Sequence, residues 1–212
     1  MKASVLILSL ILAAAMTSQA QSIDGCTVNR SAPPAGMYSW APHAEISVYF
    51  VSGMFTIEQR ETLVLAMQNW TVASRKVGAG VRFDYAGETA GLVNCSNCLT
   101  ITRREVFKND RKHYAFFNPL RQDSQGVLIS AWIDFDFATT SPQALQGFMA
   151  HELGHGMGLW DCRNCKKKQT IMNGFPGINK DNGLIEPSFC DLEVVRQVYQ
   201  RRLAANTQGG PD

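Results

Sequence analysis

The chain has 212 residues, of which 45% are hydrophobic and 18% charged, and its formal net charge is +2. This composition is typical of an ordinary globular protein, and the length fits a single domain. The net charge is too small to predict binding to nucleic acid or to an anionic membrane surface.

The first twenty residues have the features of a secretory signal peptide. Lys2 supplies a positive charge, and residues 5–16 (VLILSLILAAAM) form an apolar run that is too short to span a bilayer comfortably. The small residues Ser18 and Ala20, at the two positions that a signal peptidase inspects, predict cleavage after Ala20. No later segment is long and apolar enough to span a membrane. We therefore expect a signal peptide over 1–20 and a secreted or periplasmic mature protein, monomeric and without membrane contact.

Cysteine usage agrees with export. The six cysteines are Cys26, Cys95, Cys98, Cys162, Cys165 and Cys190. An even number in an exported chain favours disulfides, so we expect each C-x-x-C motif to pair internally and Cys26 to pair with Cys190. The alternative is a four-thiolate zinc site built from the two C-x-x-C motifs, which export disfavours because it needs free thiols.

In chain order, an irregular arm over 21–44 precedes a β-rich strand at 45–51. A helix follows, because Thr56 can cap its first turn while Gln59 completes a capping box. Alternating apolar and polar residues predict four more strands, at 81–87, 99–107, 113–119 and 126–137. The strand at 113–119 stops at a proline, as edge strands can.

The C-terminal third contains two further helices. Ser141 and Pro142 are expected to begin the first of them, because proline at the first helical position loses no hydrogen bond. This helix is expected to run to residue 158. Residues 159–187 are irregular, residues 190–203 form the last helix, and the tail over 204–212 is expected to be disordered. The order strand, helix, four strands, helix, coil, helix predicts one α+β domain over 45–203 around a single twisted sheet.

The motif HELGHGMGLWD, residues 151–161, carries the chemistry. His151 and His155 are four residues apart, which on a helix places both imidazoles on one face, about 5–6 Å apart. Two imidazole nitrogens can then bind one ion at about 2.0–2.1 Å. Glu152 lies beside the first histidine, where the H-E-x-x-H motif of zinc peptidases has its general base.

A catalytic zinc ion needs a third protein ligand and a fourth position for water. Asp161 is the candidate, because glycine adopts left-handed backbone geometry at low cost and Gly158 can therefore end the helix and turn the chain back. Cys162 is the alternative, since thiolates bind zinc well. We expect one catalytic Zn²⁺ ion.

These residues resemble the metzincin zinc endopeptidases, whose pattern is H-E-x-x-H-x-x-G-x-x-H followed by a Met-turn. Every fixed position matches except the last, where Asp161 replaces histidine, as in the snapalysin branch. TIMNG at 170–174 resembles the Met-turn and implies that Met172 lies beneath the metal. Gly174 stands where astacins and serralysins have a zinc-binding tyrosine, so no tyrosine ligand is expected.

The resemblance covers most of residues 45–200. YAFFNP at 114–119 and GVLISAWIDFDF at 126–137 are similar to the edge strand and fifth strand of matrixins. The resemblance implies a zincin fold with a mostly parallel five-stranded sheet, an antiparallel edge strand, two long helices and a C-terminal helix. It also implies that a cleft binds the backbone of a protein or peptide substrate. Its expected lining is Ala115, Phe116, Phe117 and Asn118.

The function implied is that of a secreted zinc endopeptidase in which Glu152 activates the attacking water. The alternative is a non-catalytic zinc-binding or protein-binding module on the same fold, and the intact Glu152 argues against it. Two smaller questions stay open. Cys26 could hold the enzyme latent as a zinc-bound thiolate, or simply form a disulfide. Asp134 and Asp136 could hold calcium, or face solvent on alternating positions of a strand.

Overall fold

The computed structural model describes residues 38–105, 107–108, 111–112, 114–162, 165, 169–173 and 185–208. The expected signal peptide, most of the expected N-terminal arm, Cys26 and Gly174 lie outside these ranges and stay predictions. Among the described residues, no helix is both long enough and apolar enough to cross a bilayer.

A five-stranded sheet forms one layer of the fold. Its strands, in spatial order, are β2 (Arg82–Thr89), β1 (Glu45–Val51), β3 (Cys98–Arg103), β7 (Leu128–Phe135) and β6 (Ala115–Gln122). The first four run parallel, and β6 runs antiparallel to β7 at the edge. The predicted arrangement of a mostly parallel sheet with an antiparallel edge strand is therefore confirmed.

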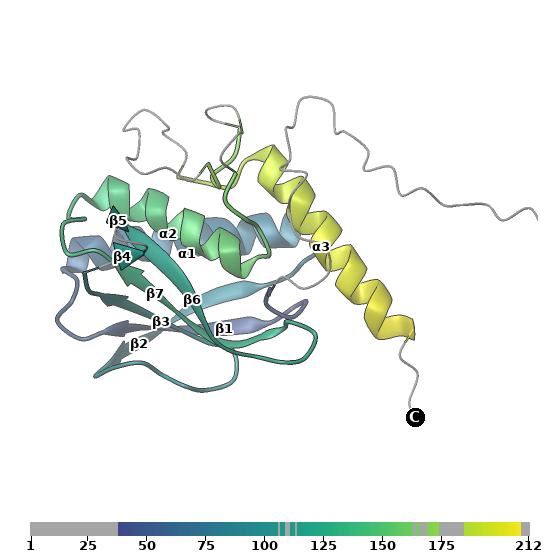
Figure 1. Ribbon diagram of the computed structural model, residues 1–212, viewed down its shortest axis with the longest axis horizontal. Coiled ribbons are helices and arrows are strands. Elements are labelled where there is room, and N and C mark those ends of the chain that lie inside the picture. The colour runs from purple at the N-terminus through teal and green to yellow at the C-terminus, as the bar shows by residue number, and fades with distance from the viewer. Residues whose placement is uncertain are drawn as a thin grey trace, which may run out of the picture.

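In the part of the chain that the structure describes, three helices complete the fold: α1 (Ile57–Lys76), α2 (Pro142–Gly156) and α3 (Phe189–Gln208). Figure 1 shows α1 and α2 side by side over one face of the sheet and α3 at the end of the layer. Thr56 and Gln59 form the predicted capping box of α1, and Ser141 caps α2 with a proline at its start. The buried Trp70 Nε1 donates to the carbonyl oxygen of Ala150 at 2.7 Å, which joins α1 to α2.

The core lies between the sheet and these two helices. Phe50, Ile101, Ile133 and Phe117 are paired in register across four neighbouring strands, so they form one apolar row on the helix-facing side. All four are buried. Because successive side chains of a strand alternate between its faces, the position of Phe117 in this row determines which side chains of the edge strand point toward α2.

Several element boundaries differ from those expected, and three of these differences are the largest. The third strand ends at Arg103, and a separate two-stranded ribbon, β4 (Phe107–Lys108) with β5 (Arg111–Lys112), follows it. A strand of two residues is too short to show an alternating pattern of apolar and polar residues, so the sequence does not predict it. The edge strand continues past Pro119 to Gln122, because the register shifts beyond the proline and an edge strand tolerates its missing N–H. The last helix runs to Gln208, beyond its expected end at residue 203.

The two acidic side chains at the C-terminal end of β7, Asp134 within the strand and Asp136 just after it, do not face solvent. Asp134 and Asp136 are each 1% exposed. The Asp134 carboxylate accepts hydrogen bonds from Trp132 Nε1 at 2.8 Å and Asn118 Nδ2 at 2.9 Å, and it pairs with Arg104 at 2.5 Å. Burial raises the pKa of Asp134, and these partners oppose that rise. The solvent-facing interpretation is therefore wrong.

Candidate metal centre

Helix α2 carries three of the predicted site residues near its C-terminal end. The rings of His151 and His155 lie 5.0 Å apart between centroids and are nearly perpendicular, at 88°. Both side chains are partly buried, and Glu152 is 5% exposed. A Glu152 carboxylate oxygen lies 3.9 Å from His155 Nε2. The helical spacing therefore places two imidazoles and one buried carboxylate around the same point.

The chain reverses directly after α2. Gly158 has a φ of +89°, a conformation that costs glycine little and other residues considerably more. The N–H of Gly158 donates to the carbonyl of His155 and that of Leu159 to the carbonyl of Gly154, each at 3.0 Å. This turn ends the helix and directs the following segment back toward the histidines.

The reversal brings Asp161 against both imidazoles. Its Oδ1 lies 3.1 Å from His151 Nε2 and 3.6 Å from His155 Nε2. Among the described residues, these three form a group whose ligand atoms all lie within 4.8 Å of one another. Ligands at about 2.0–2.1 Å around a tetrahedral ion are roughly 3.3 Å apart. The donor set and its spacing therefore fit Zn²⁺.

Backbone carbonyls orient the two rings. His151 Nδ1 lies 2.9 Å from the carbonyl oxygen of Ile171, and His155 Nδ1 lies 3.0 Å from that of Leu159. A carbonyl can only accept, so each Nδ1 carries the hydrogen and donates it. Each Nε2 is therefore the nitrogen that faces Asp161, which is the arrangement that metal-binding histidines usually have. Sequence reasoning missed both carbonyls because any residue can supply one.

The segment that resembles a Met-turn lies under the helix. Met172 is buried, and a Cβ added at Gly154 would meet its sulfur at 2.5 Å, so the two segments are in close contact. Asp191 at the start of α3 holds this segment: its carboxylate accepts from Thr170 Oγ1, from the Ile171 N–H at 2.9 Å and from the Ser188 N–H at 2.8 Å. Asp191 lies in the first turn of the last helix, and no motif in the sequence pointed to this second role.

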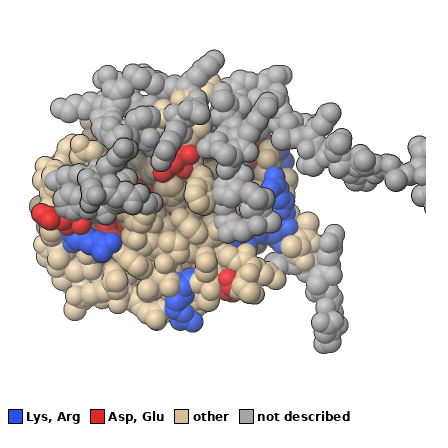
Figure 2. All heavy atoms as spheres, viewed as in Figure 1, with Lys and Arg blue, Asp and Glu red and all other residues tan. Residues whose placement is uncertain are grey.

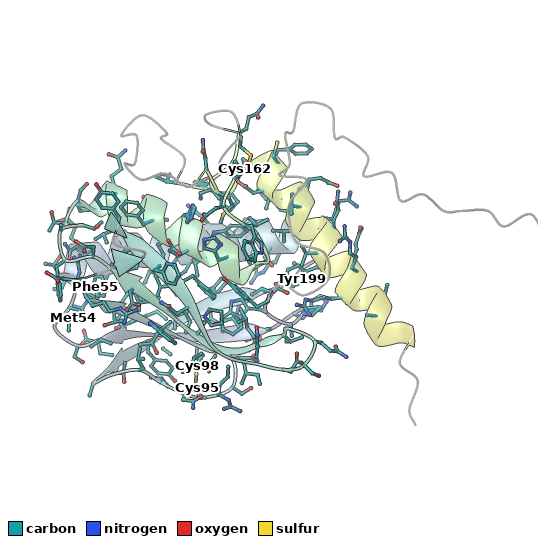
Figure 3. The ribbon with its side chains drawn as sticks, in the orientation of Figure 1. Met54, Phe55, Cys95, Cys98, Cys162 and Tyr199 are labelled. Carbon is teal, nitrogen blue, oxygen red and sulfur yellow. A yellow bond between two sulfur atoms is a disulfide. The ribbon has the colours of Figure 1, made fainter. Side chains whose placement is uncertain are left out.

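Cys162 is not available as a ligand. It forms a disulfide with Cys165, and Cys95 forms one with Cys98, so both C-x-x-C motifs pair internally as expected. Figure 3 shows the two bridges in different parts of the molecule, Cys162 near the start of α3 and Cys95 with Cys98 at the sheet. The alternative third ligand and the four-thiolate zinc site are therefore both wrong.

Charge around the imidazoles favours a bound cation. Burial lowers the pKa of His151, but the hydrogen bond that its ring donates to Asp161 and the negative charges of Glu152 and Asp161 outweigh it and raise that pKa to about 9. Without metal, His151 is therefore protonated at neutral pH, and its proton compensates for the nearby carboxylates. A divalent ion can take over that compensation.

The four residues of the edge strand that are expected to line a cleft point to both faces of the sheet. Ala115 and Phe117 face α2; the Phe117 and His155 ring centroids are 6.5 Å apart. Asn118 points to the opposite face, where it bonds Asp134, and Phe116 shares that face by alternation. Because successive side chains of a strand alternate between its two faces, only Ala115 and Phe117 point toward α2, and the expected substrate cleft along this strand stays a prediction.

The chain was also compared with known proteins. No protein-family model and no curated protein sequence matches it. Among solved structures it is similar to an archaemetzincin from Methanopyrus kandleri, with 13% identity and a TM-score of 0.46 over 81% of this chain and 99% of that one. It is also similar to metalloproteinase-II from Bacteroides fragilis, with 12% identity and a TM-score of 0.45 over 79% of this chain and 57% of that one. The chain thus spans little more than half of the second protein.

Proposed function

We propose that the protein is a secreted, zinc-dependent endopeptidase of the metzincin type. The observation that carries the proposal is the meeting of His151 Nε2, His155 Nε2 and Asp161 Oδ1 around one point, with the carboxylate of Glu152 beside them. Two imidazoles and one carboxylate form a donor set that suits zinc, and three protein ligands leave a position for water. A purely structural zinc site takes four protein ligands.

The reaction assigns a role to each of these groups. Zinc, when bound, polarises the scissile carbonyl and lowers the pKa of a water molecule toward about 7. Glu152 accepts a proton from the attacking water and then donates it to the amine nitrogen as the C–N bond breaks. The carbonyls of Ile171 and Leu159 keep the imidazoles in the orientation and tautomer that the site needs.

The edge strand supplies a way to hold the substrate. β6 pairs with β7 along one side, and no strand among the described residues pairs with its other side. An extended peptide can add to such an edge through backbone hydrogen bonds. Phe117 of this edge strand packs closely on Gly156 at the end of α2, because a Cβ added at Gly156 would meet the Phe117 ring at 3.2 Å. A peptide lying there passes beside the metal centre.

The charge distribution supports a peptide substrate over a nucleic acid. On the face shown in Figure 2, the described residues carry Lys and Arg side chains in separate groups, interspersed with acidic ones. A nucleic-acid-binding surface instead needs a continuous basic patch.

Digestion of unfolded casein tests the proposal. The purified secreted protein is assayed as isolated, after chelation, and after zinc is restored, beside a Glu152→Gln variant. We expect chelation to abolish cleavage, zinc to restore it, and Glu152→Gln to lower the rate about 10³-fold or more with its zinc content unchanged. If the parent protein binds zinc and is as inactive as the variant, the non-catalytic module is the correct interpretation.

A further inference from the structure

The segment 38–40, which the sequence places in an irregular arm, lies across the end of the metal-binding helix. The N–H of Trp40 donates to the carbonyl of Gly156, the last residue of α2, at 3.0 Å. Both backbone polar groups of Ser39 form hydrogen bonds. Its N–H donates to the carbonyl of Gly126 at 3.1 Å, and its carbonyl accepts from the N–H of Leu128 at 2.9 Å. The backbone next to Tyr38 is therefore tied to α2 and to the start of β7.

The last helix fixes the same segment from the other side. Arg202 of α3 donates from Nε to Ser39 Oγ at 2.5 Å and from a terminal nitrogen to the carbonyl of Gly126 at 3.1 Å. A Cβ added at Gly158 would meet Ser39 Cβ at 3.5 Å, so the segment also contacts the turn that leads to Asp161. Three parts of the fold thus contact Ser39, the residue that follows Tyr38: the start of β7, α3 and the turn after α2.

The ring of Tyr38 continues the wall of the cleft. It stacks on Phe117, with centroids 5.6 Å apart and an angle of 15° between the rings. Phe117 in turn is the edge-strand side chain whose ring lies 6.5 Å from that of His155. Tyr38, Phe117 and His155 therefore form a continuous series of rings that ends at the metal centre.

The hydroxyl of Tyr38 is in the electric field of the site. Burial raises the pKa of Tyr38 to about 12, and the negative charges of Glu152 and Asp161 raise it in the same direction. These carboxylates are the proposed base and the proposed third ligand, so the charges that act on the phenol are those of the metal centre. A phenol in this setting keeps its proton and can act as a hydrogen-bond donor.

We propose that Tyr38 is a further catalytic residue, whose Oη donates a hydrogen bond to the carbonyl oxygen of the scissile peptide as that oxygen gains negative charge. The inference rests on the proposed peptidase function. A donor helps most when the protein holds it in place before the reaction, because no reorganisation is then needed. The stacked ring and the fixed backbone at Ser39 and Trp40 meet that condition.

A Tyr38→Phe variant tests the hydroxyl alone, because it keeps the stacked ring. The matched control is Tyr114→Phe, whose ring also stacks on an aromatic side chain, Phe148, with centroids 5.5 Å apart. We expect Tyr38→Phe to lower kcat about 10²-fold with KM within about twofold, and Tyr114→Phe to leave both unchanged. Zinc content and melting temperature should match the parent in both variants.

Binding provides a readout that does not depend on turnover. A phosphinic peptide has a tetrahedral centre with negatively charged oxygens in place of the scissile amide, and its affinity is measured by calorimetry for the parent and for Tyr38→Phe. The matching amide peptide is measured in a Glu152→Gln background, with and without Tyr38→Phe, so that it is not cleaved. We expect the phosphinic peptide to bind at least tenfold more weakly without the hydroxyl and the amide peptide to bind equally.

Two results would overturn the role of Tyr38 while leaving the peptidase intact. One is an active parent protein with a Tyr38→Phe variant of equal kcat. The other is an equal loss of affinity for the phosphinic and amide peptides, which would show that the hydroxyl serves substrate packing alone. If the zinc-loaded parent cleaves no peptide and binds neither ligand, the proposed function itself is wrong, and the proposed role of Tyr38 is then wrong as well.

Discussion

Asp161 Oδ1 lies 3.1 Å from His151 Nε2, although a helix end and a reversal of the chain separate the two residues. The contact exists because Gly158 adopts a positive φ, which turns the chain back. In addition, the Nδ1 of His151 donates a hydrogen bond to the carbonyl oxygen of Ile171, which fixes the ring. Metal affinity should therefore depend on the carboxylate of Asp161, on Gly158 and on the segment that contains the carbonyl of Ile171.

Removing the carboxylate should weaken zinc binding strongly. Changes to residues that only orient a ligand typically cost 10- to 100-fold in metal affinity, so we expect Asp161→Ala to cost at least about 100-fold. Competition with a chromophoric chelator measures the affinity. Glu193→Gln, on α3, serves as a control that should leave it unchanged. An Asp161→Ala protein that retains zinc as tightly as the parent would remove Asp161 from the ligand set.

Gly158→Ala should disturb both stability and the metal site. Alanine at a φ of +89° costs about 1–2 kcal/mol, and its Cβ would meet Val198 Cγ1 at 3.0 Å. We expect a lower free energy of unfolding, measured with urea, together with weaker zinc binding because Asp161 is displaced. Gly91→Ala is the matched control, since a Cβ there meets nothing within 4 Å and its φ is not positive. Equal stability of both variants would contradict the importance of the turn.

The stability of the metal-free protein should fall at alkaline pH. The pKa of His151 is raised from 6.5 to about 9, so its contribution to stability is complete below about pH 6.5 and is lost as the pH rises through 9. Zinc competes with this proton, so zinc binding at pH 7 should release about one proton and at pH 10 almost none. Calorimetry in buffers with different protonation enthalpies counts the protons. The same count at both pH values would show that His151 does not hold the proton.

Asp191→Ala should weaken zinc binding without touching a ligand. The buried carboxylate accepts from the Ile171 and Ser188 N–H groups, and losing it leaves the buried Ile171 N–H without this partner, at about 1–3 kcal/mol. Because the carbonyl of Ile171 orients His151, zinc affinity should fall about 10- to 100-fold as well. Asp84→Ala, which removes an exposed ion pair with Arg82, should change neither quantity measurably. An Asp191→Ala protein with parental zinc affinity would show that the segment holds its position unaided.

Local patterns predicted the secondary structure well. The capping box of α1, the proline start of α2 and the alternating strands all depend on neighbouring residues, and the structure has them close to the expected positions. The errors occur where distant parts of the chain decide the outcome. The edge strand passes Pro119 because β7 continues to pair with it, and Asp134 is buried because Asn118 and Trp132 bond to it.

The sequence by itself determined the placement of His151, Glu152 and His155 and the position of the turn at Gly158, because a helical repeat and a glycine's backbone freedom act within a few residues. Only the tertiary structure decided that the carbonyls of Ile171 and Leu159 orient the rings, and that Phe117 faces the site while Asn118 faces away. It alone places Tyr38 against Phe117. Backbone carbonyls carry no sequence signature, and contacts between distant segments follow from the packing of the whole core, which no local pattern encodes.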